Sequence, residues 1–216
     1  MASEENWLRF NKKAKIVYGD CETFNLNLSF SVNRPWSIAL LKCEGEQILE
    51  EVETFIKWDD CKFKIGEGAA RVTQFNQKVF DSKCIDPKMA FQKLWPVLKW
   101  ADYVILHNGL RFDCYLLKGY AEWMGEDWKW MMSKIIDTKS IAQGLKLNQP
   151  YRPDADNWLE YQYRLSNSVV KGIKTNLTAL CKEYGIVVDE TRTHGALYDL
   201  HLLKQVFEKQ KFQIEL

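Results

Sequence analysis

Short apolar segments rich in β-branched residues alternate along this chain with segments of helical periodicity. The run AKIVY, residues 14–18, is followed directly by Gly19 and Asp20, which predicts a buried central strand. Two further strand-like runs, at 36–42 and 47–57, are separated by the turn-prone CEGE, which predicts a hairpin added to the first strand. This order constrains the fold most, because strands that alternate with helices pack as an α/β domain.

The same alternation continues downstream. Asp86 followed by Pro87 predicts the start of a helix, and the short apolar run DYVILHN predicts the next strand. We expect the remaining elements in this order: a helix ending near Gly125, a strand at 134–138 leading into the helix SIAQGL, and closing helices at 176–184 and about 195–209. Residues 148–170 have weaker periodicity and form the least defined part of the chain.

Composition narrows the class of protein. The 216 residues are 46% hydrophobic and 27% charged, typical of a globular protein, and no linker or repeat divides them, so we expect one domain over 1–216. The net charge of +1 means that contact with nucleic acid requires a local surface. No apolar run approaches the roughly 18 residues of a membrane span, and the chain start lacks a signal core, so we expect a cytoplasmic protein with no membrane partner. The scattered cysteines include no C-x-x-C pair, which favours reduced thiols over structural zinc.

Two acids, Asp20 and Glu22, lie two residues apart at the end of the first predicted strand. Because side chains alternate faces along a strand, residues two apart point to the same side. Two carboxylates held together raise each other's pKa unless a cation neutralises them, and Mg²⁺ or Mn²⁺ prefers such hard oxygen ligands. The alternative is an exposed strand end with two solvated acids, and D-x-E alone does not exclude it.

A second polar group, HNGLRFD, follows the predicted strand at 102–108. His107 and Asn108 end that strand, and Asp113 lies near the start of the next helix. In α/β sheets, ligands gather at the carboxyl ends of strands and the adjoining helix starts. Asp113 alone is equally explained as a first-turn acid that favours the helix dipole.

The third group is HGALYDLHLL, with His194 before a helix and Asp199 inside it. A step of five residues turns about 140° around a helix axis, so the two side chains do not share one helix face. His194 is expected in the loop or first turn, and Asp199 on the helix body. Each alone is also compatible with an ordinary surface role.

Taken together, D-C-E-T, H-N-x-x-x-F-D, I-I-D-T, L-x-x-L-C-x-x-Y-G-I and R-x-x-H-G-A-L-x-D-x-x-L-L follow in one order over nearly the whole chain. This set resembles the DEDDh exonucleases, the family of the bacterial proofreading epsilon subunit, ribonuclease T and oligoribonuclease. The resemblance implies a ribonuclease-H-like α/β fold with a central mixed β-sheet flanked by helices. It also implies hydrolysis of nucleotides from a 3′ end.

The resemblance assigns roles to five residues of this sequence. Two divalent ions, Mg²⁺ or Mn²⁺, would be held by Asp20, Glu22, Asp113 and Asp199, with Asp20 bridging both ions. His194 would take the proton from the attacking water, since an imidazole with an ordinary pKa of about 6.5 is mostly neutral at physiological pH. Two cations then neutralise the charge that develops on the phosphoryl oxygens.

Residues expected to meet the substrate are less sharply defined. The family often has D-x-E-T-T-G, whereas here Thr23 is followed by Phe24 and Asn25. We include Thr23 and Phe24, with His107 and Asn108, among the candidate substrate contacts. Phe24 would stack on a terminal base or pack in the core, and the two alternatives stay open.

Residues 148–174 match no known pattern but interleave aromatic rings with cations. We expect this stretch to lie over the mouth of the site, where Lys171 and Lys174 would hold phosphates of the strand. The alternative is a lid whose rings pack on the fold, because Asp154, Asp156 and Glu160 dilute its charge.

Three functions are compatible with these patterns. The leading hypothesis is a 3′-to-5′ exonuclease on the 3′ end of single-stranded DNA, free-standing or bound to a DNA polymerase. The second is an exoribonuclease on short RNA or RNA 3′ tails. The third is a non-catalytic relative that binds nucleic acid or a polymerase, which four clustered acids disfavour, because without metal they repel phosphate.

Overall fold

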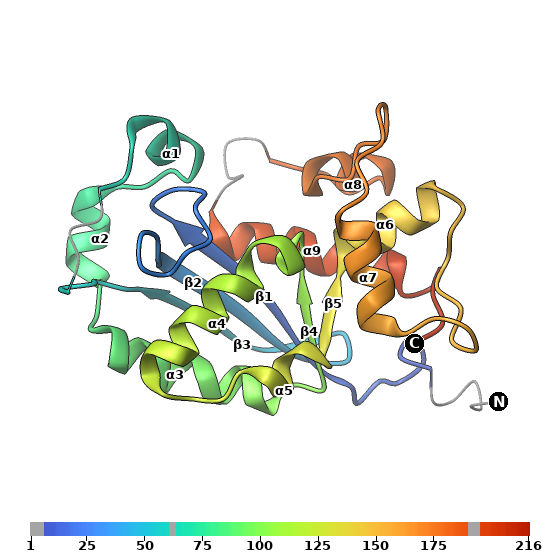
Figure 1. Cartoon of the computed structure of the whole chain (residues 1–216), viewed down its shortest axis with the longest axis horizontal. Helices are drawn as coiled ribbons and strands as arrows, with labels where there is room; N and C mark the ends of the chain where they lie inside the picture. The colour runs from blue at the N-terminus through green and yellow to red at the C-terminus, as the bar shows by residue number, and fades with distance from the viewer. Residues whose placement is uncertain (1–6, 61–63, 190–194) are drawn as a thin grey trace.

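The computed structural model describes residues 7–60, 64–189 and 195–216. Its sheet has the strand order β3-β2-β1-β4-β5 (Figure 1). The strands are β1 (Lys15–Thr23), β2 (Pro35–Glu44), β3 (Gln47–Phe55), β4 (Tyr103–Leu106) and β5 (Ile135–Asp137). β1 is antiparallel to β2 and parallel to β4, β2 is antiparallel to β3, and β4 is parallel to β5. This mixed sheet, with the hairpin of β2 and β3 beside β1, confirms the predicted α/β class.

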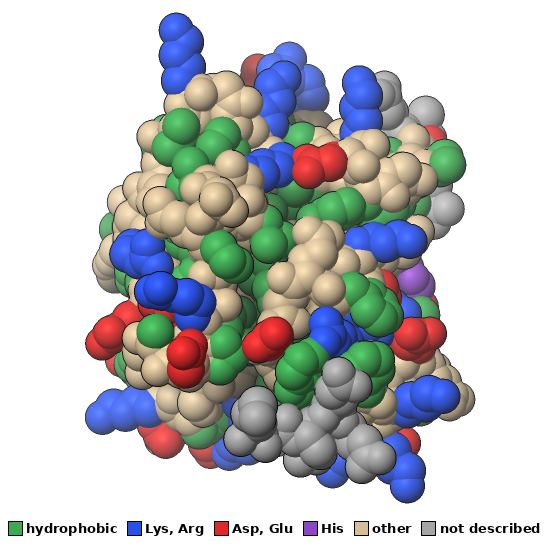
Figure 2. All heavy atoms as spheres, turned by 90° about the vertical axis from the view of Figure 1, so that its right-hand side faces the viewer, with side chains coloured by type: hydrophobic (Ala, Val, Ile, Leu, Met, Phe, Trp, Pro, Cys, Tyr) green, Lys and Arg blue, Asp and Glu red, His purple; other side chains and the backbone are tan. Residues whose placement is uncertain are grey.

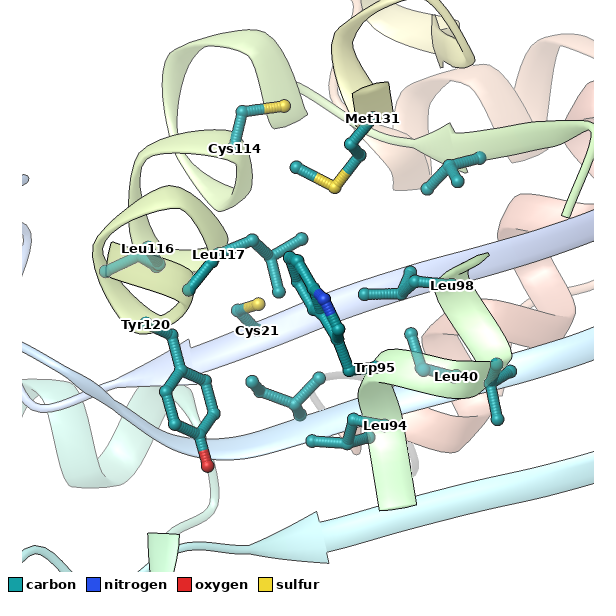
Figure 3. Packing of buried hydrophobic residues seen from close by; sticks show 14 of the residues in the cluster. Cys21, Leu40, Leu94, Trp95, Leu98, Cys114, Leu116, Leu117, Tyr120 and Met131 are labelled. Carbon is teal, nitrogen blue, oxygen red and sulfur yellow. The ribbon is translucent and has the colours of Figure 1, made fainter. Parts of the chain in front are cut away.

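Helices cover both faces of the sheet. On one face, α3 (Pro87–Trp100) and α4 (Asp113–Met124) enclose a large apolar cluster. Figure 3 shows Trp95 of α3 and Leu116, Leu117 and Tyr120 of α4 gathered over Cys21 and Leu40 of the sheet. On the other face, α9 (Ala196–Gln210) packs on β1 and β2 through Leu200, Leu203 and Phe207. The core therefore has two layers separated by β1, which is buried on both sides.

Shorter helices complete the chain. They are α1 (Glu67–Val72), α2 (Gln77–Lys83), the 3-10 turn η2 (Gly109–Arg111), α5 (Lys129–Met132), α6 (Thr138–Lys146), α7 (Trp158–Ser166) and α8 (Leu177–Glu183). The sequence did not predict α1 and α2. It also missed α7 in the weakly periodic stretch, because α7 is held by specific bonds to the sheet: Trp158 Nε1 and Gln162 Nε2 both donate to the Ile135 carbonyl, each at 3.1 Å.

Two general expectations can be checked against the described residues. None of their helices has both the length and the apolar character needed to cross a bilayer. The described cysteines, Cys21, Cys43, Cys84, Cys114 and Cys181, are all free thiols. Figure 2 shows one face of the molecule, on which Lys and Arg side chains are interspersed with Asp and Glu rather than gathered in one basic surface.

Candidate active site

Asp20 and Glu22 lie in the last part of β1, at the strand end where they were predicted. The apolar run stops at residue 18, and pairing with β2 extends β1 to Thr23, with Asp20 opposite Ala39 and Glu22 opposite Ser37. By strand alternation both acids point to the same face as Tyr18, which is the face covered by α9. The predicted common orientation therefore holds, with the acids anchored on a paired strand.

Asp113 is the first residue of α4 and is only 4% exposed. Its Oδ1 accepts a hydrogen bond from the backbone N–H of Cys21, the residue between the two β1 acids, at 3.0 Å. This bond ties the start of α4 to the centre of the D-x-E segment. The second predicted motif is thereby brought to the first across 92 positions of sequence.

A buried carboxylate, Asp137, fixes the turn that leads to Asp113. Its Oδ1 accepts from Asn108 N at 3.1 Å and its Oδ2 from Leu110 N at 3.1 Å. Oδ1 also accepts from the N–H groups of Lys139 and Ser140, at 3.0 and 3.2 Å, as the N-cap of α6. The turn needs this support because Asn108 has a left-handed φ of 63°. The sequence showed Asp137 within I-I-D-T, but no role was assigned to it.

The third motif reaches the site through α9. Asp199 lies in the first turn of this helix and, with Asp20 and His107, lines a cavity of about 440 Å³. Asn176 and Thr178, at the start of α8, line the same cavity. His194, the predicted proton acceptor, lies outside the described residues, so its position remains a prediction.

Electrostatics link the four acids. Burial, then the charges of Asp113 and Asp199, hold the pKa of Asp20 well above its ordinary value. Burial, then the charges of Asp20, Asp199 and Asp113, raise the pKa of Glu22 to about 9. Burial raises the pKa of Asp113 to about 7, although the hydrogen bonds from Cys21 oppose the shift. The arrangement is thus a buried concentration of negative charge that a cation would relieve.

The acids fit divalent ions as a set of donors. Within the described residues no three His, Cys, Asp or Glu side chains form a ready-made metal cage. Asp20 and Asp199 nevertheless line one cavity, Asp113 is bonded to the backbone beside Asp20, and carboxylate oxygens are the ligands that Mg²⁺ and Mn²⁺ prefer. Catalytic ions keep positions for water and substrate, so an open arrangement suits them better than a closed cage.

The predicted substrate contacts near the acids occupy different environments. Thr23 is 6% exposed and its hydroxyl donates to the Asn25 carbonyl at 2.6 Å, closing the turn after β1. Phe24 packs in part against the core and also lines a cavity of about 340 Å³ with Trp58, Phe75 and Phe80. Both alternatives for Phe24 are therefore compatible with its position.

The polar pair after β4 is held from the α6 side. His107 Nδ1 lies 2.9 Å from the Thr138 hydroxyl, and Asn108 Oδ1 accepts from Lys139 Nζ at 2.9 Å. Burial, and then the charge of Lys139, lower the pKa of His107 to about 4. His107 is thus a neutral side chain at the cavity wall.

The stretch 148–174 divides into packed and exposed parts. Tyr151, Trp158 and Tyr161 contact one another with ring centroids 4.8 to 5.8 Å apart, and Arg152 pairs with Asp156 at 3.6 Å. These residues serve packing, as the lid alternative expects. Lys171 and Lys174 are exposed to solvent.

This chain is similar to two known proteins, one of which has been solved in two complexes. A segment of the PolC-type DNA polymerase III of Ureaplasma parvum serovar 3 is 24% identical over 200 residues, which is 92% of this chain and 12% of that protein. E. coli exonuclease I in complex with a dT13 oligonucleotide has a TM-score of 0.68 and 17% identity, covering 91% of this chain and 40% of that one. The same enzyme with a dA16 oligonucleotide has a TM-score of 0.70, 17% identity and coverage of 90% and 40%.

These likenesses confirm the ribonuclease-H-like fold, while the chain spans well under half the length of each relative. The family model described as an exonuclease, RNase_T, matches residues 17–207 and so includes β1, α4 and the start of α9, which carry the acids. By that match this chain belongs to the exonuclease family, in the DnaQ-like, DEDDh-type group that its motifs predicted.

Proposed function

We propose that this chain is a metal-dependent 3′-to-5′ exonuclease that acts on single-stranded DNA as one domain over residues 1–216. The observation that carries the proposal is the meeting of acids from three elements: Asp20 of β1 and Asp199 of α9 line one cavity, and Asp113 of α4 accepts from the backbone N–H between Asp20 and Glu22. A fold that only bound nucleic acid would gain nothing from acids that repel phosphate. The oligonucleotides in the exonuclease I complexes support the choice of DNA.

Divalent ions would be held by Asp20, Glu22, Asp113 and Asp199, two ions with Asp20 shared between them. When bound, such ions supply charge neutralisation at the phosphate and a lower pKa for the attacking water.

The protein's own groups set the geometry. The Cys21 amide fixes one oxygen of Asp113, and Asp137 fixes the turn before it. His194 would accept the proton of the attacking water, which is a step that general bases accelerate by about 10²- to 10⁴-fold.

The remaining assignments concern the substrate and partners. Phe24 would stack on the 3′-terminal base, and Thr23, His107 and Asn108 would shape the wall beside the terminal nucleotide. Lys171 and Lys174 would attract more distant phosphates. The PolC-type relative supports association with a DNA polymerase, which we propose as the partner beside the strand itself.

The test uses 5′-labelled single strands of DNA and RNA with identical sequence. Shortening from the 3′ end that requires Mg²⁺ or Mn²⁺, stops in EDTA and is faster on DNA is the expected result. Cleavage in EDTA after dialysis would contradict metal dependence. A higher rate on the RNA strand than on the DNA strand would mean that RNA is the preferred substrate.

A further inference from the structure

A shallow notch of about 120 Å³ lies between the loop after β1, the start of α4 and the end of α7. Its wall is formed by Leu28, Arg111, Tyr115, Tyr163 and Asn167, with Leu110 and Ser166. We call this feature the upstream notch. Of these side chains, Tyr163 belongs to the aromatic stretch 148–174 that the sequence predicts to lie over the site, and Arg111 lies in the HNGLRFD motif.

Two of the three walls of the notch belong to segments that also carry the acids. Arg111 lies two positions before Asp113, in η2, and the loop that presents Leu28 follows directly after Glu22 and Thr23. The third wall, α7, comes from a distant part of the chain and reaches Arg111 through the Ser166 carbonyl. A strand whose 3′ end lies at the acids must leave past surfaces of this kind.

The guanidinium of Arg111 is oriented so that it can bind an anion. One of its nitrogens, Nη1, donates to the Ser166 carbonyl at 3.3 Å, which orients the guanidinium while its other N–H groups stay available. The side chain is exposed, and across residues 7–60, 64–189 and 195–216 no ion pair joins it to a carboxylate. A guanidinium with free donors in a fixed orientation matches the geometry of a phosphate.

The two tyrosines supply flat surfaces for bases. Tyr115 is 41% exposed, on the first turn of α4, and Tyr163 faces it from α7. Their proximity is also seen electrostatically, because burial and then Tyr115 raise the pKa of Tyr163. Tyr151, Trp158 and Tyr161 of the same stretch are occupied with one another, so Tyr163 is the ring directed at the notch.

The loop that carries Leu28 is held in a fixed conformation by hydrogen bonds. Asn33 is fully buried, and its Nδ2 donates to the carbonyls of Asn25 and Asn27, at 2.6 and 2.8 Å. Asn25 N in turn donates to Asn33 Oδ1 at 3.2 Å. These bonds close the loop on itself, and Leu28 at 37% exposure is left as an apolar edge.

We propose that the upstream notch binds the single-stranded DNA on the 5′ side of the scissile phosphate. Arg111 pairs with a phosphate there, a base stacks on Tyr115, and Tyr163 and Leu28 border it. At about 120 Å³ the notch admits a phosphate or a ring edge, not a whole nucleotide, so the rest of the nucleotide lies over the exposed ring of Tyr115. This inference rests on the proposed exonuclease function and extends it beyond the terminal nucleotide.

The test compares two substrates, 5′-labelled dT12 and the p-nitrophenyl ester of thymidine 5′-monophosphate. The ester has a scissile phosphate but no upstream nucleotide. Arg111→Ala should raise KM for dT12 about tenfold and reduce the salt slope of log KM by about 0.7, the contribution of one neutralised phosphate on a single strand. The rate on the ester should not change.

Tyr115 variants separate stacking from hydrogen bonding. Tyr115→Ala should raise KM for dT12 about tenfold with an unchanged salt slope, and Tyr115→Phe, which keeps the ring, should behave as wild type. Arg152→Ala is the matched control. It removes the same charge from an exposed position outside the notch, where Arg152 pairs with Asp156 in the wild type. It should leave both substrates unaffected.

The outcomes distinguish the notch from the active site. Equal losses on dT12 and the ester, or no loss on dT12, would overturn the role of the notch while leaving the exonuclease intact. A wild-type protein that hydrolyses neither substrate in Mg²⁺ would overturn the proposed function, and the role of the notch with it.

Discussion

The turn that leads to Asp113 and the segment 148–174 are held in different ways. The turn from β4 to α4 is fixed by a buried polar network in which Asp137 accepts from four backbone N–H groups. The segment 148–174 combines ring packing with single hydrogen bonds from Trp158 and Gln162 to the Ile135 carbonyl, and its exposed part carries Lys171 and Lys174. Buried hydrogen-bond networks require particular residue types, whereas apolar packing accepts many substitutions. The first region therefore carries recognisable motifs, and the second does not.

The largest expected effect comes from the acids that the first region supports. Asp20→Asn should reduce turnover on single-stranded DNA by on the order of 10³-fold, because charge on the phosphate is then poorly neutralised. The checks are a labelled-strand assay and a melting curve that shows a folded variant. Asp154→Asn, an exposed acid in the second region, is the control and should keep full rate. A near-normal rate in Asp20→Asn would mean that the site is elsewhere.

Asp137→Asn tests whether the polar network acts on the site. An amide NH₂ cannot accept from the N–H groups that now face a carboxylate oxygen, so the turn should shift Asp113. We expect activity to fall by about 10- to 100-fold, as for other groups that orient ligands, with a higher Mg²⁺ concentration needed for half-maximal rate. Lower thermal stability with an unchanged Mg²⁺ requirement would mean that Asp137 has only a structural role.

The same network predicts a pH effect on stability. The pKa of His107 is lowered to about 4 in the folded chain, below the ordinary value of about 6.5 that the unfolded chain has. Between these pH values the unfolded state binds more protons, so this contribution to stability is present above pH 6.5 and is lost as pH falls toward about 4. Denaturant unfolding at several pH values should show a smaller loss in His107→Asn than in wild type. Identical pH profiles for the two proteins would contradict this account.

The smallest effect is expected in the second region. Replacing Lys171 and Lys174 by Ala should weaken strand binding a few-fold and flatten its salt dependence, by about 0.7 in slope for each phosphate that is no longer neutralised. Fluorescence anisotropy of a labelled strand over a range of salt concentrations measures both quantities. If the affinity for the strand and its salt slope were unchanged, this segment would have a role in packing only.

Sequence patterns predicted most of what the first region contains. Strand alternation predicted the common face of Asp20 and Glu22, and the resemblance predicted the fold. The resemblance also grouped these acids with Asp113 and Asp199, and that grouping stays a prediction. The patterns missed the extension of β1 to Thr23, because that extension depends on pairing with β2. They also left Asp137 without a role, since its carboxylate joins α6 to a turn 27 to 29 positions away.

The second region was harder to predict because its contacts join distant segments. Arg111 and Ser166 are 55 positions apart, and neither lies in a pattern that indicates the other. The rings of Tyr161 and Tyr163 are indistinguishable in the sequence, yet one is buried in packing and the other lines the upstream notch. Only tertiary structure separates these roles.

The central claim is that four acids from three separate elements form one binding site for divalent ions. It is tested most directly by titrating the metal-free protein with Mn²⁺ and following free Mn²⁺ by electron paramagnetic resonance, without substrate. The account predicts binding of two ions per chain in wild type, loss of that binding in Asp20→Asn, and wild-type binding in Asp154→Asn. Equal Mn²⁺ binding by wild type and Asp20→Asn would contradict it.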